Sequence, residues 1–125
     1  MTGATLDAGA LIAFERAKRT IVTLVARALE RGDQLAVPAG VVAQVWRDGD
    51  RQVRLVRLLA SEVVEVVALD DATARAVGQL CGISGAVDVV DVSVVWCARE
   101  RGHRVVTSDA DDLRRIDPKI KLVSV

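Results

Sequence analysis

Four acidic residues stand where short apolar runs give way to the segments that follow them. Asp7 closes an apolar run near the start, Asp88 and Asp91 open a valine-rich stretch, and Asp109 follows a strand-like run at 105–107. Carboxylates gathered at one edge of a parallel sheet repel one another unless a cation lies among them. Hard divalent ions such as Mg²⁺ and Mn²⁺ prefer such oxygen ligands. The pattern therefore predicts a metal-dependent phosphodiesterase.

Phosphodiester hydrolysis needs an activated water and charge compensation at the non-bridging and leaving oxygens, and one or two divalent ions can supply both. Nucleophilic triads do not compete with this interpretation, because His103 is the one histidine and lies close to a predicted helix end. Cys81 and Cys97, both in apolar surroundings, are interpreted as two buried free thiols of a protein in a reducing compartment. A zinc site needs more Cys and His than the chain offers.

The elements that must position the acids follow from hydrophobic periodicity and from cap residues. We predict strands at 3–7, 35–37, 63–69, 104–107 and 121–124, and helices at 8–16, 17–30, 40–47, 51–60, 71–80, 88–101 and 110–115. The strand at 63–69 is expected to be buried on both faces. The stretch 88–101 is ambiguous: five valines favour a strand, whereas its acidic first turn and the stop at Gly102 favour a helix. We predict a buried helix.

Strands that alternate with helices imply a parallel sheet covered on both faces. The fold predicted is one α/β domain, residues 1–125, with four or five strands. In such sheets a ligand binds outside the carboxyl ends of the strands. Asp7 and Asp109 fall there, and Asp91 reaches the same edge from the start of a helix.

Composition narrows the class of protein. A chain with 51% hydrophobic and 27% charged residues has the composition of a folded domain with a core. Its 17 basic and 17 acidic residues cancel, so any contact with nucleic acid must come from a local patch. No secretion signal and no apolar stretch near the ~18 residues of a membrane span is present. We therefore predict a cytoplasmic protein with no membrane partner.

Four segments together resemble the PIN-domain family, and more narrowly its VapC-type toxins of bacterial toxin–antitoxin systems. They are LDAGALIA at 6–13, VPAGVVAQVWR at 37–47, DVVD at 88–91 and VVTSDADDL at 105–113. The resemblance implies a PIN-like fold and an endoribonuclease that depends on Mg²⁺ or Mn²⁺. It also implies an RNA substrate, a small cognate antitoxin and a homodimer.

The resemblance assigns roles to individual residues. Asp7, Asp91 and Asp109 match the family's metal-binding acids, Asp112 matches an additional acid of some members, and Asp88 shares a helix face with Asp91. As alternatives, Asp88 is an N-terminal helix cap, and Asp109 with Asp112 is a capping pair.

Gln44 stands where much of the family has a glutamate, which removes one negative charge while keeping an amide oxygen. Gln44 is therefore predicted as a catalytic residue. Asp88 is a candidate to supply the negative charge that Gln44 lacks. The alternative function is a weak or inactive PIN-like domain that binds RNA or a partner protein. A receiver domain fits poorly, because Asp7 has no acidic neighbour early in the chain.

Substrate contacts are predicted from polar residues near the acids. Thr107 and Ser108 are candidates for phosphate contacts, although hydroxyls at strand ends often bind the local backbone. Arg47 and Arg51, with Arg54, are candidates for gripping RNA phosphates, or are ordinary solvated arginines.

Overall fold

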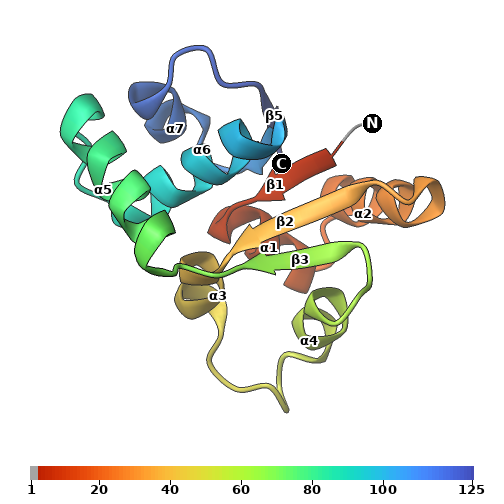
Figure 1. Ribbon diagram of the computed structural model, residues 1–125. Helices are drawn as coiled ribbons and strands as arrows, with labels where there is room; N and C mark the ends of the chain where they lie inside the picture. Colours follow the sequence, from red (N-terminus) through yellow and green to blue (C-terminus); the bar gives the residue numbers. More distant parts are fainter. Residues whose placement is uncertain (1–2) are drawn as a thin grey trace.

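Five parallel strands form one sheet in the order β3-β2-β1-β4-β5 (Figure 1). The structure is a computed structural model that describes residues 3–125, so residues 1 and 2 of the predicted domain lie outside it. The strands are β1 (Gly3–Leu6), β2 (Gln34–Pro38), β3 (Val64–Val67), β4 (Arg104–Thr107) and β5 (Leu122–Ser124). The predicted α/β fold with a parallel sheet is confirmed.

Helices connect the strands and cover both faces of the sheet. They are α1 (Ala8–Glu15), α2 (Arg19–Arg31), α3 (Ala39–Val45), α4 (Val53–Leu59), α5 (Asp71–Ser84), α6 (Val89–Arg101) and α7 (Ala110–Ile116). Figure 1 shows α5, α6 and α7 on one side of the sheet and α1, α2 and α4 on the other. The short α3 follows β2 and packs against both α1 and α6.

The core lies between the sheet and these two helical layers. Its fully buried side chains come from both, among them Leu6, Leu11, Val37, Val92 and Val106. Burial of one such side chain stabilises the fold by about 1.5–3 kcal/mol. Within residues 3–125 no single helix has the length and apolar character to span a membrane. Helices α5 and α6 taken together are long and apolar enough, but the chain bends by 106° between them.

The stretch at 88–101 is the predicted helix, α6, despite its valines. Asp88 caps its first turn, and Gly102 ends it in the left-handed conformation with φ +66°. Between these signals the helix packs against the sheet and against α5 and α7, which buries most of its apolar residues. Tertiary burial therefore outweighs the β propensity of valine here.

Two predictions about the middle of the chain are wrong. The strand at 63–69 is not buried on both faces: β3 is an edge strand, and its Glu65 and Val66 are exposed. Helix α5 does not end before Gly82 but continues to Ser84. Its stop is Gly85, whose φ of +76° is the left-handed conformation that glycine adopts without strain.

The order of the strands fixes where a ligand site belongs. From β1 the chain builds β2 and β3 on one side, then crosses back to place β4 and β5 on the other. The carboxyl ends of β1 and β4 therefore lie at a topological switch point, where a crevice opens in open α/β sheets. Asp7 follows β1 directly, and Asp109 lies two positions beyond the end of β4.

Candidate active site

Asp7 is fixed in place by the backbone on both sides. Its Oδ1 accepts a hydrogen bond from the N–H of Ala10 over 2.9 Å, which caps α1, and its own N–H donates to the carbonyl of Val106. Burial raises the pKa of the Asp7 carboxyl, although hydrogen bonds from Thr107 and from backbone N–H groups oppose that shift. The first predicted acid is thus a buried, pre-positioned carboxylate at the switch point.

Thr107 connects Asp7 with Asp109. Its hydroxyl donates a hydrogen bond to Oδ2 of Asp7. The Thr107 hydroxyl oxygen in turn accepts a hydrogen bond from the backbone N–H of Asp109 over 2.8 Å. Thr107 is fully buried. Its hydroxyl therefore links the Asp7 carboxylate to the backbone of Asp109, and the substrate contact predicted for it stays a prediction.

Ser108 lies on the exposed side of the same turn and packs against Gly9. A Cβ at position 9 would lie 1.9 Å from Oγ and 2.9 Å from Cβ of Ser108, so a larger residue there would force Ser108 to move. Gly9 was missed as a site residue. The sequence feature that could have pointed to Gly9 is a glycine in the first turn of a helix, between Ala8 and Ala10, where alanine would stabilise the helix better.

Asp88 and Asp91 occupy the start of α6. Oδ1 of Asp88 accepts hydrogen bonds from the N–H groups of Val90 and Asp91, over 3.0 and 3.1 Å. Asp88 is therefore the helix cap that one of the two interpretations predicted, and Asp91 projects from the first turn that it caps.

Electrostatic repulsion shows that the acids of the site lie together. Burial and then repulsion from Asp88 and Asp112 raise the pKa of Asp91 to about 6, with smaller contributions from Asp7 and Asp109. The four other predicted acids therefore all act on Asp91, although they come from the ends of two strands and the starts of α6 and α7.

The two acids nearest α7 differ in their partners. The neighbouring Asp112 carboxyl, with which it can share a proton, raises the pKa of Asp109. Asp112 itself accepts a hydrogen bond from Nη1 of Arg115 over 2.9 Å. Within residues 3–125 Asp7, Asp91 and Asp109 form no ion pair, so their charges are not balanced by the protein's own cations.

A cavity of about 430 Å³ opens beside this cluster. Asp88, Asp91, Asp112 and Arg115 line it, together with Ile116 and the turn between α5 and α6. Its volume falls in the range of roughly 300–1,000 Å³ that is typical of small-ligand sites. Asp91 is therefore accessible to a small ligand from this side.

Of the predicted site residues only Asp88, Asp91 and Asp112 line this cavity; those that do not are Asp7, Gln44, Arg47, Arg51, Thr107, Ser108 and Asp109. Gln44 is exposed on α3, which reaches the switch point through its packing on α1 and α6. Arg47 donates hydrogen bonds to the carbonyls of Ala43 and Trp46, and Arg51 lies 3.6 Å from Asp48 in the loop before α4. Both arginines are exposed and bound locally, so their contact with RNA stays a prediction.

The donor set suits a hard divalent cation. In the described part of the chain no three Asp, Glu, His or Cys side chains already stand at the spacing of direct metal ligands. Mg²⁺ keeps several waters and binds through one or two carboxylates, so it does not require a closed cage. Unpaired carboxylates that raise one another's pKa meet the chemical requirement, and direct ligation by Asp7, Asp91 and Asp109 stays a prediction.

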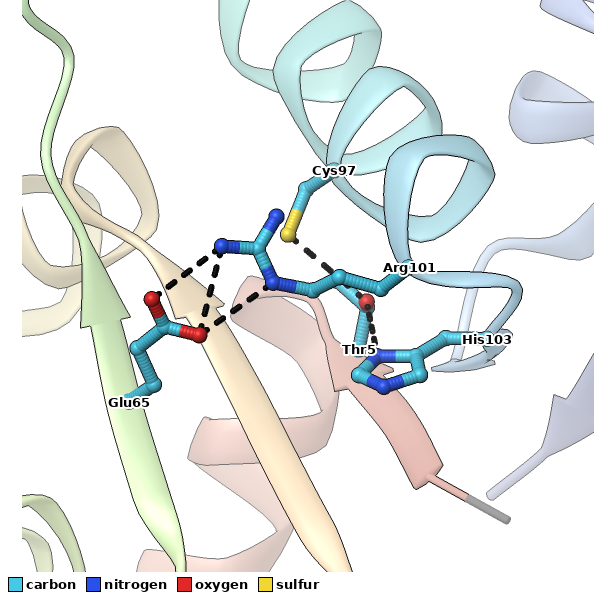
Figure 2. A network of polar contacts seen from close by, with 5 residues as sticks. All are labelled: Thr5, Glu65, Cys97, Arg101 and His103. Carbon is cyan, nitrogen blue, oxygen red and sulfur yellow. Dashed lines mark hydrogen bonds and ion pairs between the residues drawn. The ribbon is translucent and has the colours of Figure 1, made fainter. Parts of the chain in front are cut away.

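A second polar cluster, not predicted from sequence, lies on the α6 side of the sheet (Figure 2). The buried Thr5 hydroxyl lies 3.1 Å from Nδ1 of His103 and 3.8 Å from Sγ of Cys97. Nearby, Arg101 forms a forked ion pair with Glu65 of β3, with Nη2 and Oε2 3.1 Å apart. We call these five residues the Thr5 network. Both cysteines are free thiols, and Cys97 is buried as predicted. The predicted burial of Cys81 is wrong, because its side chain is only partly buried.

The fold and the site define a class: a parallel α/β domain with an acidic crevice at its switch point. The chain belongs to the PIN-domain family, whose model matches residues 4–119. PIN domains are nucleases that generally depend on divalent metal ions. No curated protein matches the sequence.

Solved structures share the fold across almost the whole chain. VapBC2 from Rickettsia felis, bound to a DNA fragment from its promoter, matches with a TM-score of 0.72 and 15% identity, covering 98% of each chain. DNA-bound VapBC from Salmonella typhimurium matches with a TM-score of 0.69 and 19% identity, covering 99% of this chain and 98% of the other. FitAcB from Neisseria gonorrhoeae gives 0.62 and 16%, covering 95% of each.

Proposed function

We propose that this PIN domain is a Mg²⁺- or Mn²⁺-dependent endoribonuclease and the toxin of a type II toxin–antitoxin pair. The observation that carries the proposal is the cluster of acids in which burial, and then repulsion from its neighbours, raise the pKa of Asp91 to about 6. Within residues 3–125 no Lys, Arg or His forms an ion pair with Asp7, Asp91 or Asp109. The similarity to VapBC and FitAB, which are toxin–antitoxin complexes, supports the biological role.

Each residue of the site has a defined task in this proposal. Asp7, Asp91 and Asp109 hold the ion, Thr107 fixes the first and third of them, and Asp88 and Asp112 add negative potential. A bound Mg²⁺ or Mn²⁺ supplies the positive charge for the phosphate oxygens and a water of lowered pKa. The chain's own residues orient the RNA in the cavity beside Asp91, and the exposed Ser108 is a candidate for a phosphate contact.

Cleavage of total RNA in the presence and absence of Mn²⁺ tests the proposal. The wild type is expected to cleave with Mn²⁺, and Asp91→Asn to lose at least about a hundredfold in rate. Asp71→Asn is the matched control, because Asp71 occupies the first turn of α5 and is exposed far from the cavity. Equal cleavage by the wild type and Asp91→Asn would identify a contaminant and refute the assignment.

Gln44 gives the alternative its specific basis. A site that lacks the family's second acid holds the ion less tightly, and the domain would then act as a module that binds RNA or a partner protein. RNA binding without cleavage at millimolar Mn²⁺ would favour this alternative over the nuclease.

The partners belong to the same proposal. We infer a small cognate antitoxin and a homodimer, in keeping with the complexes that share the fold. Exposed apolar side chains around the turn between α5 and α6 supply contact surface next to the acidic cavity, with Ile83 80% and Val87 94% exposed. Co-purification with the product of an adjacent small reading frame, followed by its mass in solution, tests both partners.

A further inference from the structure

One arginine lies beside the acids of the candidate active site. Three carboxylates line the cavity of about 430 Å³, those of Asp88, Asp91 and Asp112, and in the described part of the chain Arg115 is the only basic residue of its lining. Arg115 comes from the last turn of α7 and Asp112 from the first turn of the same helix. The arginines that the sequence suggested for RNA contacts do not line this cavity.

A single hydrogen-bonded ion pair holds the Arg115 guanidinium. Its Nη1 donates to Oδ1 of Asp112 over 2.9 Å, and the Arg115 side chain is 77% exposed. Arg101 provides the contrast, because three hydrogen bonds join it to Glu65 and its side chain is 24% exposed. Exposed ion pairs within one helix add little stability, so the Arg115 side chain can leave Asp112 at little cost.

The position of Arg115 suits the phosphate of an RNA that is bound at the acids. A phosphate that enters the cavity is repelled by the three carboxylates, and a guanidinium on the cavity wall offsets part of this repulsion. The planar guanidinium fork can donate two parallel hydrogen bonds to phosphate oxygens, whereas it donates one to Asp112. Exchange of Asp112 for a phosphate therefore gains a hydrogen bond and keeps the charge pairing.

We propose that Arg115 binds a phosphate of the RNA in this cavity, next to the acids that act on the scissile bond. Arg115 leaves Asp112 when the phosphate enters, so it is a substrate-binding residue as well as a partner of Asp112. This inference rests on the proposed endoribonuclease function and adds a residue to that same site.

The neighbouring Arg114 is a close match for Arg115. It lies on the same turn of α7 and forms an ion pair with Asp111, three positions earlier, with Nη1 and Oδ1 3.8 Å apart. Arg114 does not line the cavity. The variants Arg114→Gln and Arg115→Gln therefore remove the same charge and the same kind of ion pair, and they differ in access to the cavity.

Fluorescence anisotropy with a labelled RNA oligomer of mixed sequence measures binding by the whole chain, with Ca²⁺ in place of Mn²⁺ and with gel analysis to show that the RNA stays intact. We expect Arg115→Gln to weaken binding by about tenfold. The slope of the logarithm of the binding constant against that of the salt concentration should fall by roughly 0.7, the value for one phosphate contact on a single strand. Arg114→Gln should change neither quantity. Arg115→Lys, which keeps the charge without the fork, should lie between the wild type and Arg115→Gln.

Titration with Mn²⁺ in the absence of RNA separates a phosphate contact from an effect through Asp112. If Arg115 only held Asp112 in place, its loss would weaken the binding of Mn²⁺ and of RNA together. For a phosphate contact the two should diverge. Removal of a positive charge from beside the acids should leave the Mn²⁺ affinity of Arg115→Gln equal to that of the wild type or tighter by up to about threefold.

The inference and the proposed nuclease function can fail separately. RNA cleavage by the wild type, together with equal RNA binding by Arg115→Gln and Arg114→Gln, would overturn the inference and leave the nuclease intact. Absence of cleavage by the wild type, with RNA binding weakened in Arg115→Gln alone, would refute the nuclease and retain the phosphate contact. No RNA binding by the wild type, an equal loss in both variants, or a joint loss of Mn²⁺ affinity would each overturn the inference.

Discussion

The acid cluster and the Thr5 network are two polar regions of one sheet, and they balance their charges in opposite ways. In the network the cation Arg101 meets the anion Glu65, and the Thr5 hydroxyl meets His103 (Figure 2). In the cluster four carboxylates repel that of Asp91, and of these five acids only Asp112 has an arginine partner within residues 3–125. A balanced region needs nothing further to be stable, whereas the cluster needs an external cation.

The pKa shifts express the same difference. Around Asp91, burial and four neighbouring carboxylates all raise the pKa, so every influence there disfavours the ionised form. For Arg101 the hydrogen bonds to Glu65 raise the pKa and so favour the charged form of the pair. Strongly perturbed groups without compensation concentrate at functional sites. The contrast supports the proposed active site at the carboxyl end of the sheet and a structural role for the network.

Removing one carboxylate from the cluster should have the largest effect. Asp7→Asn keeps the cap on α1, because Asn caps helices as well as Asp does, yet it deletes the charge. Titration with Mn²⁺ should show affinity reduced by at least about a hundredfold. Glu65→Gln removes a carboxylate from the balanced region and should leave Mn²⁺ affinity unchanged. If both variants bind Mn²⁺ like the wild type, the ion does not bind at the cluster.

Adding a negative charge to the site should raise the affinity for Mn²⁺, by less than the loss of a carboxylate lowers it. Gln44→Glu restores the acid that much of the family carries on α3 and should tighten Mn²⁺ binding by roughly tenfold. The matched control is Gln79→Glu, an exposed position on α5. Tighter binding in the control but not at position 44 would show that net charge, rather than the place of the side chain, sets the affinity.

Much of the fold could be predicted because local signals agree with the tertiary structure. Apolar periodicity, the cap at Asp70 and the stops at Gly32 and Gly102 place most elements within a few residues of their observed bounds. The end of α5 was predicted wrongly, because both Gly82 and Gly85 could have stopped the helix. The left-handed backbone that selects Gly85 is seen only in the folded chain. Exposure of β3 was also out of reach, because an edge position depends on strand order.

The site divides along the same line. The acids could be chosen from their places at strand ends and helix starts, since those places converge in any parallel sheet. The relay through Thr107, the packing of Gly9 on Ser108 and the Thr5 network could not be chosen, because each joins residues about a hundred positions apart. Contacts of that kind are decided by register, which the sequence pattern leaves open.

The pH dependence of stability should report the repulsion in the cluster directly. Because the folded-state pKa of Asp91 is raised from 3.8 to about 6, its contribution is present below pH 4 and is lost as the pH rises through about 6. After discounting for solvent screening, the loss is about 1 kcal/mol, or roughly 4 °C in Tm. Thermal unfolding in EDTA at pH 5 and 7.5 should show this difference between the wild type and Asp91→Asn.

Mn²⁺ provides the control for that experiment. At pH 7.5 the ion should restore the lost stability in the wild type and not in Asp91→Asn, because binding to the folded state alone stabilises it. An identical pH profile for both proteins would mean that Asp91 is not repelled by its neighbours.

Breaking the balanced region should have the smallest effect. The side chain of Glu65 is 55% exposed and that of Arg101 is 24% exposed, so their pair is only partly shielded from water. Glu65→Gln should therefore lower the free energy of unfolding by about 0.5 kcal/mol, and less in high salt. Urea unfolding measures this loss, and Glu62→Gln, at an exposed position before β3, is the matched control. A loss of several kcal/mol would show that the Thr5 network depends on the ion pair for its position, because removing Glu65 would then release Arg101 from beside Cys97 as well.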